Sequence, residues 1–207
     1  FATHMAAKLD ICWNETMNNT PVQDRSYNTA ILLGKGGTGK THVLNATVRA
    51  TVAKFWGGDA VKAVAYSNAQ AYGIDGHTIH RETKMTGTDG CSYSELRCEE
   101  NKMAELEEKW GKCMLLIVEE VSMIPARLLN ALSIRASFGR QKSHKVEPLD
   151  HIKEIYGFAR IPLVIFLGDF LQLKPPRNIS LADDLDAIKR RNNEIVRGKQ
   201  EKDPRYK

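Results

Sequence analysis

The sequence predicts an α/β fold, a three-layer sandwich in which helices cover both faces of a mainly parallel sheet. Short apolar runs of strand length alternate with helical patterns along most of the 207 residues, and this alternation is typical of parallel sheets. One alternation carries a glycine-rich motif that binds phosphate between a strand and a helix. Together these observations predict a P-loop NTPase architecture.

Four strands are predicted from apolar runs bounded by polar or turn-forming residues. The third and fourth runs are apolar throughout, which predicts strands buried on both faces. The predicted strands are 29–33, 61–66, 114–118 and 163–167.

The first predicted helix follows the glycine-rich motif and ends near Trp56, before a Gly-Gly-Asp turn. Val43, Ala46, Thr47 and Ala50 share one face of this helix. Further helices are expected within 73–85, over 94–110, over 126–136 after Pro125 and from Ser180 to about Gly198. Residues 138–160 are basic and have loop character, with a short helix as an alternative for part of them.

We expect one domain over residues 29–176, since the chain is long enough to bury a substantial core. Residues 1–28 are polar and are predicted to be irregular. Residues 177–207 are expected to form a helix and a basic tail. Because the chain does not begin with Met, we expect it to be a fragment.

Gly34–Thr41 fits the phosphate-binding signature Gly-x-x-x-x-Gly-Lys-[Ser/Thr]. A Cβ atom would keep the backbone from wrapping phosphates, and the helix that follows directs N–H groups and its positive end at an anion. Lys40 is expected to reach the β- and γ-phosphates, and the Thr41 hydroxyl to bind Mg²⁺. The expected nucleotide-binding residues are Gly34, Gly36, Gly37, Thr38, Gly39, Lys40 and Thr41.

Composition argues against several other classes of protein. No apolar run approaches the length of a transmembrane helix, so no membrane partner is expected. The four cysteines form no Cys-x-x-Cys pair, which predicts a reduced, intracellular protein. His77 and His80 lack the companions of a metal site. The net charge of +5 weakly favours a nucleic-acid partner, and nothing indicates an oligomeric state.

Polar side chains follow the third and fourth predicted strands. Glu119 and Glu120 come after the third, and Asp169 and Gln172 after the fourth, at the sheet edge where α/β proteins bind ligands. One glutamate could hold Mg²⁺ while the other orients or deprotonates water; alternatively, the pair begins a solvated loop. Gln172 could sense the γ-phosphate or be an ordinary loop residue.

Three stretches together resemble motifs I, II and III of superfamily 1 DNA helicases, especially the Pif family and the related helicases of Helitron transposons. They are Gly34–Thr41, Leu116–Met123 and Gly168–Leu173. The family's second motif is Asp-Glu-[Ile/Val]-Ser-Met, and its third is Gly-Asp-x-x-Gln-Leu followed by prolines. Gly76–His80 resembles the family's Gly-x-Thr-[Ile/Leu]-His element. Ala65–Ala71 is a degraded counterpart of the family's Ala-Pro-Thr-Gly-x-Ala-Ala element.

The resemblance extends over about residues 30–176 and implies the first RecA-like domain of an ATP-dependent, 5′-to-3′ DNA helicase. ATP and Mg²⁺ are the implied cofactors. Lys40, Glu120 and Gln172 are the implied catalytic residues, with Glu120 as base and Gln172 as γ-phosphate sensor. Thr41 and Glu119 are the implied metal ligands. The motif III strand is expected between the strands of motifs I and II.

Single-stranded DNA is the implied partner, and Ser67, Thr78 and His80 lie in elements that face it in relatives. For Thr78 and His80, a capped helix start packed on the domain is the alternative. DNA repair, recombination and telomere maintenance are the implied processes, in the nucleus or mitochondrion of a eukaryotic cell.

Three features depart from the family. Glu119 stands where the family has Asp, Gln23 is only a candidate for the adenine-reading Gln, and a second RecA-like domain is not found by residue 207. We therefore expect these residues alone not to unwind DNA. Two alternatives stay open: a catalytically decayed, transposon-derived module that binds ATP or DNA, and another P-loop NTPase such as a small-molecule kinase or nucleotide-dependent switch.

Overall fold

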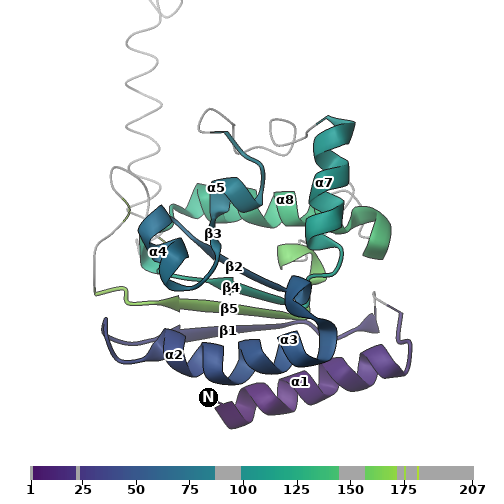
Figure 1. Ribbon diagram of the computed structural model, residues 1–207, viewed down its shortest axis with the longest axis horizontal. Helices are drawn as coiled ribbons and strands as arrows, with labels where there is room; N and C mark the ends of the chain where they lie inside the picture. Colours follow the sequence, from purple (N-terminus) through teal and green to yellow (C-terminus); the bar gives the residue numbers. More distant parts are fainter. Residues whose placement is uncertain are drawn as a thin grey trace, which may run out of the picture.

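The computed structural model describes residues 2–21, 24–86, 99–144 and 157–171, together with Pro175 and Leu181. Its centre is a five-stranded sheet in which all pairings are parallel, with the order β1-β5-β4-β2-β3 (Figure 1). The strands are β1 (Asn28–Leu33), β2 (Val61–Ala65), β3 (His77–Thr78), β4 (Leu115–Val118) and β5 (Leu163–Gly168). The predicted α/β fold with a parallel sheet is therefore confirmed.

All four predicted strands are present, and β5 lies between β1 and β4 as the resemblance implied. Every residue of β4 and β5 is buried, as expected of strands covered on both faces. β3 was not predicted. It has only two residues, which pair with Val64 and Ala65, and two residues are too few to show a strand period.

One helical layer contains α1 (Ala2–Met17) and a continuous helical stretch that follows the phosphate-binding motif. This stretch comprises α2 (Lys40–Leu44), a π-helical turn (Asn45–Arg49) and α3 (Ala50–Trp56). Its buried face carries Leu44, Val48 and Val52. The face with Val43, Ala46, Thr47 and Ala50 instead lies toward solvent, and Val43 is 42% exposed.

The expectation that residues 1–28 are irregular is wrong, because α1 occupies most of that segment. Met5, Leu9 and Cys12 recur at helical spacing and are buried, and Met5 and Leu9 join the core on this face of the sheet. The signal is weak in the sequence because polar residues separate these positions. Packing of this apolar stripe stabilises the helix.

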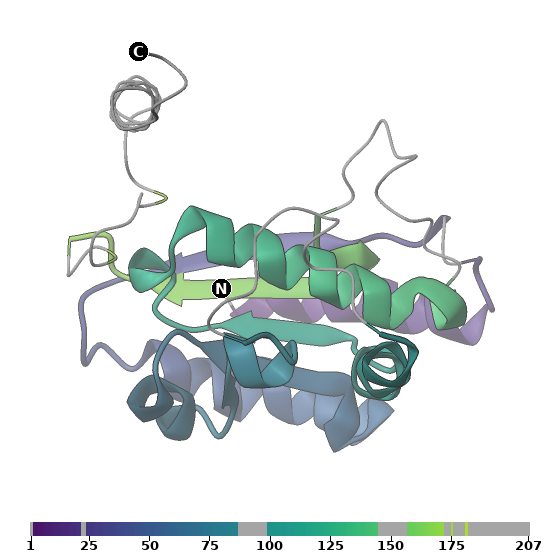
Figure 2. The ribbon, with the colours of Figure 1, turned by 90° about the horizontal axis from the view of Figure 1, so that it is seen from above.

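The other layer consists mainly of α7 (Glu100–Trp110) and α8 (Ala126–His144), with the short α5 (Ile79–Glu82) beside them. Figure 2 looks down on this layer, with α8 along the strands. The remaining elements are α4 (Asn68–Gly73) and 3₁₀ turns at Gly58–Ala60, Val121–Met123 and Gly157–Arg160. Among the described residues, no helix has the length and apolarity needed to cross a membrane.

α8 is longer than predicted, because it continues through the first part of the stretch expected to be loop. Arg140 is 1% exposed, and its guanidinium donates to the Trp110 carbonyl at 3.1 Å and the Cys113 carbonyl at 2.7 Å. These bonds hold the end of α8 against the turn between α7 and β4. Burial of such a group is tolerated when it is hydrogen-bonded. The helix predicted after Ser180, most of the loop 86–90 and residues 94–98 lie outside the described residues.

Candidate nucleotide-binding site

The glycine-rich loop is held between β1 and α2 by backbone geometry that favours glycine. Gly37 has φ of 76° and Gly39 has φ of 83°, a left-handed region that residues with a Cβ adopt at a cost. Gly39 directly precedes the first residue of α2, Lys40. At the other end of the loop, Gly34 N–H donates to the Gly168 carbonyl of β5 at 3.2 Å.

Lys40 folds back over its own loop. Its Nζ donates to the Gly34 carbonyl at 2.5 Å and to the Lys35 carbonyl at 3.0 Å. Thr38 Oγ1 donates to the same Lys35 carbonyl at 2.8 Å. The Lys40 side chain thus closes the loop through hydrogen bonds to neutral carbonyl oxygens. A bound phosphate could replace these carbonyls, because hydrogen bonds from an ammonium group to charged oxygens are stronger.

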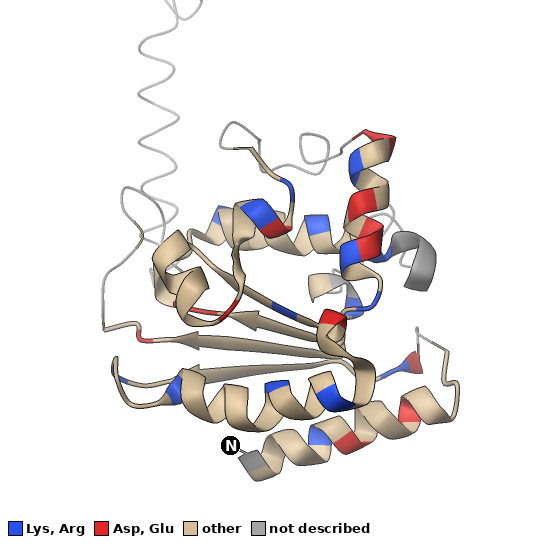
Figure 3. Ribbon diagram, in the orientation of Figure 1, with Lys and Arg blue, Asp and Glu red and all other residues tan. Residues whose placement is uncertain are grey.

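The register of the sheet brings three strand ends to this loop. Leu33 of β1 lies beside Gly168 of β5, and Val118 of β4 lies beside Phe166. A Cβ on Gly168 would lie 3.0 Å from Val121 Cγ1 and 3.2 Å from Val121 N, so glycine here allows close packing of the turn after β4. Figure 3 shows acidic residues directly after the ends of β4 and β5.

Glu119 and Glu120, which follow β4, lie next to the phosphate-binding loop. Thr41 Oγ1 donates to Glu119 Oε1 at 3.2 Å, and Glu119 N–H donates to the Val64 carbonyl at 2.9 Å. Glu120 has a left-handed φ of 50°, unusual for a residue with a long side chain and of the kind found at functional sites. The structure therefore brings Lys40, Thr41 and the two glutamates to one edge of the sheet.

Two buried carboxylate oxygens, Glu119 Oε2 and Glu120 Oε2, have no hydrogen-bond partner. Burial raises the pKa of Glu119 above its ordinary value, the hydrogen bond from Thr41 lowers it, and the charge of Glu120 raises it. The described residues contain no cluster of three or more His, Cys, Asp or Glu able to hold a metal alone. The two carboxylate oxygens and the Thr41 hydroxyl could coordinate a hard cation such as Mg²⁺, with phosphate oxygens and water as its other ligands.

The raised pKa of Glu119 predicts that its charge destabilises the cation-free fold at neutral pH. A folded pKa above the unfolded value means that stability is greatest at low pH and falls as pH rises through the folded pKa. Glu119→Gln should therefore unfold at a higher urea concentration than the parent chain at pH 7.5 in EDTA. The difference should shrink as the pH falls toward 4.5, and an unchanged difference across that range would contradict this account.

The three residues expected to face DNA lie near the carboxyl ends of β2 and β3, apart from the phosphate-binding loop. Ser67 caps α4: its Oγ accepts from Gln70 N–H at 3.3 Å, and Gln70 Oε1 accepts from Ser67 N–H at 3.2 Å. Thr78 caps α5, and its Oγ1 accepts from Arg81 N–H at 3.3 Å. His80 is half-buried in the same helix. Their nucleic-acid role stays a prediction beside this capping role.

Two other predicted residues, Gln172 and Gln23, lie outside the described part of the chain. Asp169, at the end of β5, is buried, and its Oδ1 accepts from Leu171 N–H at 3.0 Å. Sequence reasoning missed the contact between Gln70 Nε2 and Met123 Sδ at 3.1 Å, which joins α4 to the turn after the two glutamates. No sequence signal indicates a pairing between such distant positions.

A parallel sheet with a phosphate-binding loop at the carboxyl end of β1 defines the P-loop class of α/β domains. A family model described as PIF1-like helicase matches residues 14–188. The chain belongs to the PIF1-like helicase family.

Individual relatives match a smaller part of this chain than the family model does. The chain is 31% identical over 143 residues to the ATP-dependent DNA helicase PIF1 of Xenopus laevis, covering 69% of this chain and 19% of the relative. It is 26% identical over 156 residues to the ATP-dependent DNA helicase RRM3 of Saccharomyces cerevisiae, covering 75% and 19%. The chain thus spans about a fifth of the length of these relatives.

The fold is similar to that of a solved Pif1 helicase from Bacteroides. The match has a TM-score of 0.50 and 22% identity, and it covers 86% of this chain and 35% of the solved chain. At this identity the likeness shows the fold alone. It agrees with the RecA-like, three-layer architecture that the sequence predicts.

Proposed function

We propose that the chain is an ATP- and Mg²⁺-binding motor domain of a DNA helicase, with its RecA-like domain over residues 29–176. The observation that carries the proposal is the placement of Lys40, Thr41, Glu119 and Glu120 at the carboxyl edge of one sheet, in a member of the PIF1-like family. α1 packs on this domain and would belong to it.

We infer a role for each residue of the site, from the structure where it is described and from the family resemblance for Gln172. The loop backbone and Lys40 would bind the β- and γ-phosphates, with the lysine giving up its bonds to Gly34 and Lys35. Thr41 and Glu119 would hold Mg²⁺, which supplies charge neutralisation at the phosphates. Glu120 would accept the proton of the attacking water, and Gln172 would contact the γ-phosphate.

Single-stranded DNA is the partner that we propose. The solved Bacteroides Pif1 is described in complex with ADP-AlF3 and ssDNA, and this supports the proposal. Ser67, Thr78 and His80 would contact DNA phosphates, which position a strand without reading its sequence. DNA repair, recombination or telomere maintenance, in a nucleus or mitochondrion, would be the setting.

A second candidate function is a decayed module that binds nucleotide without turnover. It is favoured by one contact. Glu119, whose side chain is longer than that of the family's Asp, accepts a hydrogen bond from the Thr41 hydroxyl, which would otherwise bind Mg²⁺. The substitution Glu119→Asp would restore the shorter side chain of the family at this position. A decayed module should bind ATP in both forms and gain hydrolysis only in the Asp variant.

The experiment that tests the proposed function measures ATP hydrolysis by the chain with and without oligo-dT, beside Lys40→Ala. Slow turnover that rises with DNA and disappears in Lys40→Ala is expected, since the arginine that accelerates such reactions lies in a second domain in the family. Nucleotide binding without any turnover would support the decayed module instead. Phosphate transfer to a small molecule, independent of DNA, would overturn the helicase proposal.

A further inference from the structure

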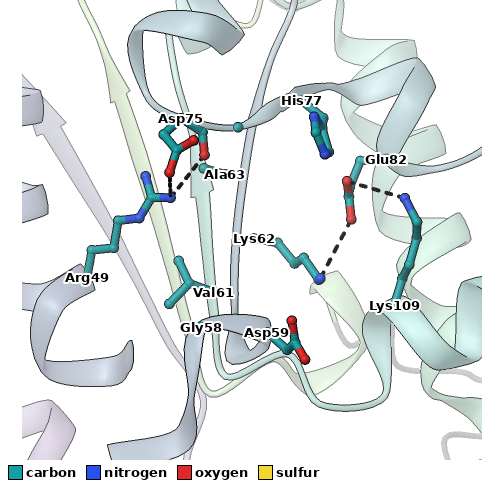
Figure 4. Close-up of a pocket in the computed structure, with 11 residues that line it drawn as sticks. Arg49, Gly58, Asp59, Val61, Lys62, Ala63, Asp75, His77, Glu82 and Lys109 are labelled. Atoms are coloured by element: carbon teal, nitrogen blue, oxygen red, sulfur yellow. Dashed lines mark hydrogen bonds and ion pairs between the residues drawn. The ribbon is translucent and has the colours of Figure 1, made fainter. Parts of the chain in front are cut away.

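Arg49 joins the helix of the phosphate-binding loop to the end of α4. It is the last residue of the π-helical turn between α2 and α3. Its guanidinium donates to the Ile74 carbonyl. It also donates to the Asp75 carbonyl at 2.9 Å and forms an ion pair with Asp75 Oδ2 at 3.2 Å (Figure 4). π-helical turns are rare and frequently occur at functional sites.

The two carbonyl bonds carry most of this link. The Asp75 carboxylate is 97% exposed, and an ion pair at such exposure contributes little. The Arg49 side chain is only 21% exposed, and its acceptors are the carbonyls just beyond the carboxyl end of α4, where a cation is favoured by the helix dipole. Arg49 therefore binds the end of this helix rather than the Asp75 side chain.

α4 is also fixed at other points. Gln70 contacts Met123 in the turn that follows the two glutamates. Beyond Asp75, a Cβ on Gly76 would lie 2.3 Å from the Ala63 carbonyl oxygen, so the chain here passes directly against β2. Thr78 then pairs with Ala65 and caps α5. α4 and the segment after it thus contact the turn that follows the two glutamates and, through Arg49, the helical stretch that begins at Lys40.

We propose that Arg49 is a positioning residue that couples nucleotide binding to DNA binding. This inference rests on the proposed function. When phosphate replaces the Gly34 and Lys35 carbonyls at Lys40, the helix that begins at Lys40 is the element through which the change would be transmitted. Arg49, on the same helical stretch, would pass that adjustment to α4 and to the elements that carry Ser67 and Thr78.

The test compares the affinity of the chain for a fluorescent dT oligonucleotide with and without a saturating, non-hydrolysable Mg·ATP analogue, by fluorescence anisotropy. We expect the analogue to change the DNA dissociation constant about fivefold or more in the parent chain, within the usual range of coupling. In Arg49→Met, which keeps the unbranched apolar part of the side chain but has no donors, the change should fall below about twofold. The affinity for each ligand alone should stay within about twofold.

Asp75→Asn is the matched control. It removes the ion pair but keeps both carbonyl acceptors, and Asn tolerates the left-handed backbone of this position, where φ is 49°. Coupling should persist in this variant. Thermal unfolding of both variants, followed by circular dichroism, checks that the fold is retained.

Three results would overturn the inference: parental coupling in Arg49→Met, loss of nucleotide affinity together with coupling, or equal loss of coupling in Asp75→Asn. A parent chain that binds both ligands without coupling would also contradict it, while leaving the proposed function in place. A parent chain that binds neither ligand would instead contradict the proposed function.

Discussion

Replacing Glu120 by glutamine is expected to abolish most ATP turnover while leaving nucleotide binding intact. Glutamine keeps the shape of the side chain but cannot accept a proton from water. General-base catalysis typically contributes about 10²- to 10⁴-fold, so hydrolysis should fall by a factor of that order. Single-turnover hydrolysis with oligo-dT present measures the loss, and titration calorimetry measures the affinity for the nucleotide.

Glu108→Gln is the control for this prediction, because it replaces the same carboxylate by the same amide at an exposed position of α7. It should leave turnover unchanged. If Glu120→Gln hydrolysed ATP at the parental rate, Glu120 would not be the base. If it lost nucleotide affinity as well, the left-handed turn after β4 would have a structural role in forming the loop site.

A large loss of stability is expected for Gly139→Ala. A Cβ at Gly139 of α8 would lie 2.5 Å from the Leu106 carbonyl oxygen and 2.7 Å from Trp110 Cβ, both in α7. Backbone atoms of a packed helix cannot move aside cheaply, and overpacking of a core costs about 1–3 kcal/mol, occasionally more. The urea midpoint of the variant should fall accordingly, with its m-value unchanged.

Gly73→Ala provides the comparison. Gly73 ends α4, and a Cβ there would meet no atom within 4 Å. Alanine should therefore be neutral or stabilise by up to about 1 kcal/mol, through the entropy of the unfolded chain. A urea midpoint for Gly139→Ala as high as that of Gly73→Ala would show that α7 and α8 are not closely packed at Gly139.

The strands and the phosphate-binding loop could be predicted because their signals are local. An apolar run such as Leu163–Leu167 and a motif such as Gly34–Thr41 specify their conformation within a few residues. α1 was missed because its stability comes from packing against the sheet layer. Which face of the first long helix is buried was not predicted, because contact with the core, rather than the spacing of small residues, selects Leu44 and Val48.

The candidate site was predicted in its residues but not in its contacts. The sequence indicates that Lys40 and Glu119 come to one edge, because both follow strands of a parallel sheet. It does not indicate that Lys40 bonds the Gly34 and Lys35 carbonyls, or that Thr41 bonds Glu119. The Lys40 bonds depend on the exact conformation of the loop, and the Thr41–Glu119 bond depends on the register of strands far apart in the chain. Only the folded structure provides both.

The most direct test of the central claim is titration of the chain with a fluorescent ATP analogue, with and without Mg²⁺, beside Lys40→Ala. We expect Mg²⁺-dependent binding that weakens at least about tenfold in Lys40→Ala, because charge-assisted bonds to phosphate are lost. Lys54→Ala, an exposed lysine of α3, should bind like the parent. Equal binding by all three proteins, or binding by none, would show that the loop at residues 34–41 is not a nucleotide site.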